Sequence, residues 1–117
     1  MKHFNKVSVA EEARSELHDK LNLTGAEVSI NILPAGASVP FVHSHKQNEE
    51  IYAVLDGEGR AEIDGESVSL KAGDWLRISP AAKRQFFAAA DKPIKYVCIQ
   101  VKANSLEGYT LNDAVVL

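Results

Sequence analysis

The feature that most constrains the fold is a series of short β-rich segments separated by turn residues, which begins after Gly25. Segments of about four to eight apolar and β-branched residues, bounded by Pro, Gly and Asp at nearly regular spacing, are typical of a sandwich or barrel. The expected strands are 26–33, 51–55, 60–63, 67–70, 75–78 and 94–101, with a further strand around Phe86. Between two of them, Asp64-Gly65 favours a two-residue hairpin turn with positive φ. The pattern predicts an all-β fold with a barrel core over about 26–101.

Ahead of this barrel, residues 9–21 are predicted to form a helix. Ser8 and Glu11 have the spacing of a capping box, in which each side chain accepts a hydrogen bond from a backbone N–H at the helix start. Apolar side chains then recur at every fourth position between Ala13 and Leu21, which makes one apolar stripe. We therefore expect a short N-terminal helix packed against the outside of the barrel.

Composition excludes some classes of function. A chain of 117 residues suits a single domain over 1–117. The net charge of −3, with 13 scattered Lys and Arg residues, argues against a nucleic-acid partner. No apolar run approaches the ~18 residues of a membrane span, and the N-terminus lacks the apolar stretch of a secretory signal. The single cysteine, Cys98, cannot form an internal disulfide. We expect a cytoplasmic protein without a membrane partner.

Two histidines and two glutamates form the chemically informative stretch. His43 and His45 are two residues apart, so in an extended strand both imidazoles project from the same face. Two such nitrogens can reach one metal ion, and a carboxylate from the next strand, Glu49 or Glu50, can complete a three-ligand site with open positions. The alternative is that the histidines lie in an exposed loop beside a solvated acidic pair. The H-x-H spacing alone does not decide between them.

The wider spacing around these residues resembles the first motif of the cupin family. That motif looks like a glycine, H-x-H, a glutamate and a further glycine, which here are Gly36, His43, His45, Glu50 and Gly57. Four residues separate His45 from Glu50 and six separate Glu50 from Gly57, as in the motif. The resemblance favours Glu50 over Glu49 as the ligand. It implies a double-stranded β-helix, a jelly-roll barrel, with a divalent metal ion at His43, His45 and Glu50, and it implies a homodimer.

The stretch 73–86 is similar to the second cupin motif, with two departures. Its opening Gly-Asp, its proline after an apolar strand and its trailing Phe86 agree with the family. Ala81 replaces a glycine, and Arg84 occupies the position where the family usually has its last histidine ligand. The resemblance covers about 26–101.

Arg84 leaves three arrangements open, because an arginine stays protonated and does not ligate metals. It can turn aside and leave a three-ligand metal site. It can instead reach into the barrel mouth and hold an anionic substrate through a bidentate contact. In the third arrangement the metal is lost, and Arg84 pairs with Glu50 in a purely organic pocket.

The function these observations favour is that of a metal-dependent enzyme, an oxygenase, isomerase or lyase, acting on a small polar or anionic molecule. The ion would be zinc, iron, manganese or nickel, all of which accept imidazole and carboxylate, provided that Arg84 does not displace it. The small-molecule ligand is expected to contact Arg84, Tyr52 and Gln47. Two alternatives remain at this point: a non-catalytic binding or sensing module, and a structural or oligomeric protein with a vestigial pocket.

Overall fold

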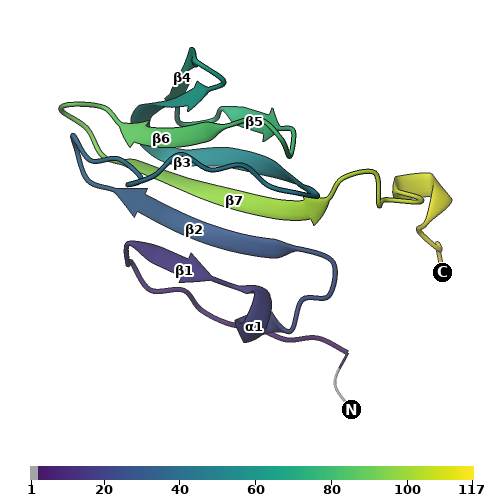
Figure 1. Ribbon diagram of the computed structural model, residues 1–117. Helices are drawn as coiled ribbons and strands as arrows, with labels where there is room; N and C mark the ends of the chain where they lie inside the picture. The colour runs from purple at the N-terminus through teal and green to yellow at the C-terminus, as the bar shows by residue number, and fades with distance from the viewer. Residues whose placement is uncertain (1–2) are drawn as a thin grey trace.

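The regular secondary structure of the protein is almost entirely antiparallel β-strand (Figure 1). The computed structural model describes residues 3–117. Its elements are β1 (Arg14–Glu16), α1 (His18–Leu21), β2 (Glu27–Leu33), β3 (Asn48–Ile63), β4 (Glu66–Lys71), β5 (Trp75–Ile78), β6 (Arg84–Ala88), β7 (Ile94–Lys102) and a 3₁₀ turn at Thr110–Asn112. The predicted all-β fold is confirmed, including the strand around Phe86 and the Asp64-Gly65 turn, where both residues have positive φ.

Strand β3 holds the two halves of the barrel together. The sheet runs in the order β1-β2-β7-β3-β4, and β5 and β6 also pair with β3. The first half of β3 pairs with β7 and β5, whereas its second half pairs with β4 and β6. We expected a turn at 56–59 between two separate strands. The chain instead continues through a bulge between Val54 and Asp56, and Gly57 bends it with a φ of 82°.

Three strands supply most of the barrel interior through their alternating side chains. The buried apolar cluster contains Tyr52, Val54, Ala61, Leu70, Ile78, Phe86, Ala88, Ile94, Tyr96 and Cys98. At its centre Phe86 stacks on Tyr52, with ring centroids 4.2 Å apart, and on Tyr96 at 5.0 Å. The rings of Tyr52, Phe86 and Tyr96 thus form an aromatic layer across β3, β6 and β7. The interior on one side of this layer is lined by polar side chains, and the interior on the other side by apolar ones.

The predicted N-terminal helix over 9–21 is wrong apart from its last turn, which is α1. Residues 14–16 form strand β1 instead, with Arg14 opposite Asn31 of β2. The free edge of β2 explains the difference, because its unpaired backbone groups need partners that a helix cannot offer. The capping box is also absent: Glu11 forms an ion pair with Lys95 of β7, at 2.8 Å between Oε1 and Nζ.

The C-terminal segment 103–117 leaves the barrel beyond the end of β7 (Figure 1). Its large apolar side chains are exposed, among them Leu111 at 90% and Val116 at 93%. Between residues 3 and 117, no helix has the length and apolar character that crossing a membrane requires.

Candidate metal centre

The two motif histidines lie on an extended segment that is fastened to the chain leading into β6. His43 and Arg84 form an isolated antiparallel bridge, in which each backbone N–H donates to the other's carbonyl, at 3.1 and 2.9 Å. The backbone N–H of His45 donates to the carbonyl of Pro80 at 2.8 Å. The H-x-H segment forms no regular strand beyond this bridge, and its two imidazole rings lie together with centroids 5.1 Å apart.

Glu50, near the start of β3, completes this cluster from the opposite side. Its side chain faces the barrel interior and the residue is 2% exposed. Glu50 Oε2 lies 3.1 Å from His45 Nε2, and Oε1 lies 3.9 Å from His43 Nε2. One ligand atom from each residue can be chosen so that all three lie within 4.8 Å of one another. The three residues expected to bind a metal are therefore brought together.

The two carboxylate oxygens of Glu50 have different surroundings. Oε1 accepts hydrogen bonds from Tyr52 Oη at 2.6 Å and from Arg84 Nη1 at 3.0 Å. Oε2 accepts a weaker one from the thiol of Cys98, at 3.3 Å, and otherwise faces His45. Oε1 is thus occupied by strong donors, whereas Oε2 retains the capacity to bind a metal ion.

Arg84 is fully buried and turned toward protein groups. Besides its bond to Glu50, its Nη2 donates to the carbonyl oxygens of Ser79 and Pro80. The guanidinium thus neutralises one oxygen of the carboxylate, in a buried pair whose members are each costly without the other. This geometry combines two of the arrangements left open above: Arg84 pairs with Glu50, and the side of the glutamate that faces the histidines stays available.

The protonation of the neighbouring groups suits a metal ligand set. Burial lowers the pKa of His43 below its ordinary value, although the Glu50 carboxylate opposes that shift. A neutral imidazole is the form that binds metals. Burial, followed by the proximity of Glu50, raises the pKa of Cys98 to about 12, so its thiol stays protonated and acts as a donor. Burial likewise raises the pKa of Tyr52, which keeps its hydroxyl proton on the bond to Glu50.

An unpartnered nitrogen tests whether a metal ion fits here. Within residues 3–117, His45 Nε2 is buried and makes no hydrogen bond, although it lies 3.1 Å from Glu50 Oε2. The distance is within the range of an ion pair, but the geometry is not that of a hydrogen bond. A buried polar atom without a partner is costly. Two imidazoles and a carboxylate oxygen suit a divalent transition metal. The residues present therefore fit such an ion.

A cavity of about 220 Å³ opens next to these three residues. Its wall includes Tyr52 and three polar side chains that sequence reasoning missed: Arg14, Asn31 and Gln100. Arg14 Nη1 donates to Asn31 Oδ1 at 2.7 Å. Because residues 9–21 were predicted as an outer helix, no sequence signal placed Arg14 inside the barrel mouth; only the pairing of β1 with β2 does.

The three expected substrate contacts have different positions. Tyr52 lines the cavity beside the histidines, and Arg84 is buried behind Glu50, outside the cavity wall. Gln47 lies in a separate surface hollow with His45, Lys46 and Asn48. Contact of these residues with a ligand stays a prediction.

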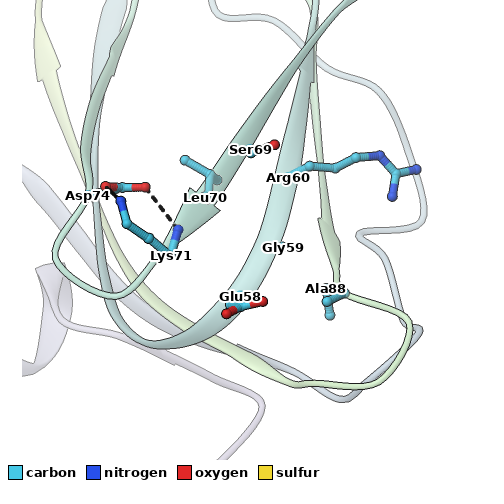
Figure 2. A pocket seen from close by; sticks show the side chains of 9 residues that line it. Glu58, Gly59, Arg60, Ser69, Leu70, Lys71, Asp74 and Ala88 are labelled. Carbon is cyan, nitrogen blue, oxygen red and sulfur yellow. Dashed lines mark hydrogen bonds and ion pairs between the residues drawn. The ribbon is translucent and has the colours of Figure 1, made fainter.

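A second, larger hollow of about 420 Å³ lies between β3, β4 and β6, away from the histidines (Figure 2). Figure 2 shows Lys71 and Asp74 directed at one another across its rim, with 3.2 Å between Nζ and Oδ1. The backbone N–H of Lys71, and then its ammonium group, lower the pKa of the Asp74 carboxyl. The residues that line this hollow include no histidine or cysteine, whereas the three candidate ligands line the smaller cavity.

The topology and the site together define a small jelly-roll barrel protein with a candidate metal centre inside one end. The chain belongs to the cupin family: the family model described as "Cupin domain" matches residues 29–100, which include all three candidate ligands and Arg84.

Individual relatives resemble this chain to different degrees in sequence identity and coverage. The crystal structure of a cupin protein from Bacteroides fragilis is 68% identical, covers 100% of this chain and 99% of its own, and superposes with a TM-score of 0.98. An uncharacterized protein of Methanocaldococcus jannaschii is 33% identical over 67 residues, which are 57% of this chain and about half (53%) of that relative. A sugar phosphate isomerase of the cupin superfamily from Silicibacter pomeroyi is 22% identical, with a TM-score of 0.67 over 78% of this chain and 60% of its own. That last likeness shows the fold alone.

Proposed function

We propose that this protein is a metal-dependent enzyme that acts on a small anionic molecule in the barrel mouth. The single observation that carries the proposal is the convergence of His43, His45 and Glu50 at the wall of a cavity large enough for a small ligand. A site with three protein ligands leaves positions for water or substrate, which distinguishes catalytic sites from closed structural ones. Isomerase, lyase and oxygenase chemistry all remain compatible with such a site.

In this proposal the bound ion supplies Lewis acidity to a substrate oxygen. The chain's own residues orient the ligands and the substrate. Tyr52 and Arg84 hold Glu50 Oε1, which turns Oε2 toward the histidines. The backbone bridge between His43 and Arg84 fixes the histidine segment against β6. Arg84 thus acts as a positioning residue for the glutamate rather than as a metal ligand.

Arg14 supports the anionic character of the substrate. Its guanidinium lies on the cavity wall, and its side chain is half exposed, at 49%. Asn31 Oδ1 accepts a hydrogen bond from Arg14 Nη1 at 2.7 Å, and Glu16 Oε1 lies 3.4 Å from Arg14 Nε, so two neighbours limit the orientation of the group. An arginine fixed in this way can bind a carboxylate or phosphate through two parallel hydrogen bonds. Arg14 therefore replaces Arg84 as the residue we propose for orienting an anion.

Metal binding is the direct test. Purified protein reconstituted with zinc, iron, manganese or nickel should retain one of these ions stoichiometrically after desalting, as measured by elemental analysis. His45→Ala and Glu50→Ala should each abolish retention. His18→Ala is the matched control, because His18 lies on α1 with a half-exposed ring and should not affect retention. Retention below about one-tenth of an equivalent in the wild type would reject the proposal.

A second function, non-catalytic ligand binding or sensing, is favoured by one observation. The position where the family usually has its last histidine is a buried arginine paired with Glu50. In that case small carboxylates or phosphates should raise the melting temperature, and no turnover should appear with metal added. Turnover that is lost in Glu50→Ala would reject this second function.

A further inference from the structure

The hydroxyl of Tyr96 is an unpartnered donor in the wall of the cavity that holds the candidate ligands. Tyr96 lines this cavity and is 4% exposed. Within residues 3–117 its hydroxyl makes no hydrogen bond, whereas the neighbouring Tyr52 hydroxyl donates to Glu50. Burial raises the pKa of Tyr96, and Cys98 and Arg14, which also line the cavity, are close enough to influence it. A ligand in the cavity can therefore accept a hydrogen bond from Tyr96 without displacing a protein partner.

Two further donors without partners line the same wall, on strands that lie side by side (Figure 1). Residues paired across neighbouring strands share a face of the sheet. Arg14 of β1 pairs with Asn31 of β2, which pairs in turn with Tyr96 of β7. Gln100 lies four residues further along β7, opposite Glu50. In the part of the chain that the structure describes, neither Arg14 Nη2 nor Gln100 Nε2 has a hydrogen-bond partner. The wall is therefore rich in donors and suits a ligand rich in acceptor oxygens.

The size and charge of the cavity favour a carboxylate over a sugar phosphate. At roughly 30 Å³ for each water molecule, its volume of about 220 Å³ holds about seven non-hydrogen atoms, and a pentose phosphate has about twice as many. Among the residues that line it, Arg14 is the only lysine or arginine, and Glu16 Oε1 lies 3.4 Å from its Nε. A phosphate group, with close to two negative charges, would meet one partly neutralised cation there. A carboxylate, with one charge, matches it.

Apolar side chains line the cavity from the segment that also carries the two histidines. Val39 is fastened to β6, because its backbone N–H donates to the Phe86 carbonyl at 2.9 Å and its carbonyl accepts from Gln85 Nε2 at 2.7 Å. The ring of Phe41 lies edge-on to that of His43, with centroids 5.7 Å apart. Phe41 lines the cavity although it is 58% exposed, which places it at the mouth. A ligand that reaches the donors therefore also contacts an apolar surface.

We propose that the substrate is a small monocarboxylic acid with a second oxygen, oxo or hydroxyl, and a short apolar side chain, and that Tyr96 binds the second oxygen. This inference rests on the proposed function, because it takes the same cavity as the substrate site. Arg14 binds the carboxylate, and Gln100 is the other donor within the wall that can reach the second oxygen. Phe41 covers the apolar side chain of the acid at the mouth.

Isothermal titration calorimetry on the full chain, after reconstitution with metal, tests this proposal with three probes. The first is 3-methyl-2-oxobutanoate. The second, 3-methylbutanoate, has the same apolar group and carboxylate but lacks the oxo oxygen. The third is ribose 5-phosphate. The wild type should bind the oxo acid about tenfold more tightly than either of the other two, because only the oxo acid satisfies the donors and fits the cavity.

Tyr96→Phe separates the contribution of the tyrosine hydroxyl from that of the metal ion. This variant should bind the oxo acid about fivefold less tightly and 3-methylbutanoate less than about twofold less tightly, because only one hydrogen bond is lost. Tyr109→Phe is the matched control: it removes the same group from a tyrosine that is 68% exposed, and it should change neither affinity. If Tyr96→Phe fails to fold, Gln100→Ala should show the same selective loss. Phe41→Ala should weaken the binding of both acids equally.

Several results would overturn this inference. They are equal affinities of the wild type for the two acids, an equal loss of both in Tyr96→Phe, tighter binding of ribose 5-phosphate, and no binding of any probe at millimolar concentration. Elemental analysis of the same samples distinguishes this failure from that of the proposed function. A wild type that retains metal but does not select the oxo acid overturns the substrate class alone. A wild type that selects the oxo acid through Tyr96 but retains no metal rejects the metal-dependent enzyme and keeps the substrate class as a ligand class.

Discussion

The two ends of the barrel interior are built from the same three strands but by different means. At the polar end, β3 contributes Glu50 and β6 contributes Arg84, and both side chains are buried and joined by a hydrogen bond of 3.0 Å. At the apolar end, the same strands contribute Val54 and Ala88, with Ile94 of β7 fully buried beside them. The aromatic layer lies between the ends. Proximity along a strand therefore does not imply a similar environment.

The comparison shows where each end is sensitive. The polar end depends on mutual satisfaction of charges, because either member of a buried ion pair is costly without the other. The apolar end depends on close backbone approach. A Cβ at Gly57 would lie 1.8 Å from the carbonyl oxygen of Pro93, and one at Gly59 would lie 2.1 Å from that of Phe87. The polar end is thus sensitive to changes in charge, and the apolar end to changes in steric fit.

The largest effect is expected at the apolar end, from Gly57→Ala. The new Cβ has no space, and the φ of 82° is unfavourable for alanine, so we expect destabilisation of about 4 kcal/mol or more. Urea denaturation measures it. Gly65→Ala is the matched control: its φ is 85° but no atom lies within 4 Å of the added Cβ, so about 1 kcal/mol should be lost. Equal losses at both glycines would contradict a steric origin.

The next largest effect is expected at the polar end, from Arg84→Met. Removing the guanidinium leaves the Glu50 carboxylate buried without its cation, which should cost about 3–5 kcal/mol in metal-free protein at neutral pH. The double variant Glu50→Gln with Arg84→Met should recover much of this loss, because no isolated charge remains. If the double variant is no more stable than Arg84→Met, the pair does not account for the sensitivity of this end.

A smaller effect is expected in the aromatic layer between the two ends, from Phe86→Leu. Phe86 is 2% exposed and stacks on two tyrosines, so the shorter side chain should lower the free energy of unfolding by about 1–2 kcal/mol. Phe87→Leu is the control on the same strand, since Phe87 faces outward beneath the Arg60 guanidinium. It should cost under about 1 kcal/mol. If Phe87→Leu lowers the free energy of unfolding more than Phe86→Leu does, the aromatic layer is not the main contact between the two ends.

The smallest effect is expected from an exposed ion pair, by Lys92→Ala. Lys92 and Glu58 lie 3.2 Å apart near the apolar end, with both side chains about half exposed. Solvent screens this pair, so we expect a change of about 0.5 kcal/mol or less in thermal or urea unfolding. Compared with Arg84→Met, this variant separates the contribution of burial from that of charge. A loss similar to that in Arg84→Met would contradict the distinction.

Much of the fold was predictable because it depends on local patterns. The alternation and turn residues indicated β2, β4, β5 and β7, the context of the neighbouring strands indicated β6, and Asp64-Gly65 indicated the hairpin. The two-residue spacing of His43 and His45 placed both rings on one side of an extended chain, as the structure has them. The assignment of Glu50 followed from the resemblance of its spacing, to the histidines and to Gly57, to the first cupin motif. These features require only neighbours within a few residues, which a sequence contains directly.

The remaining features were decided by contacts between distant segments. Residues 9–21 have a helical pattern, yet the free edge of β2 draws 14–16 into β1 and so brings Arg14 to the cavity. The turn-like residues 56–59 stay within β3, because a bulge and two close backbone contacts bend the strand instead of ending it. The orientation of the Arg84 side chain was likewise not predictable from the sequence. It depends on Glu50, 34 residues away, and on two carbonyl groups. Sequence by itself determined most of the strands and, through the family resemblance, the candidate ligands. Only the tertiary structure decided how hydrogen-bonding groups and charges are satisfied.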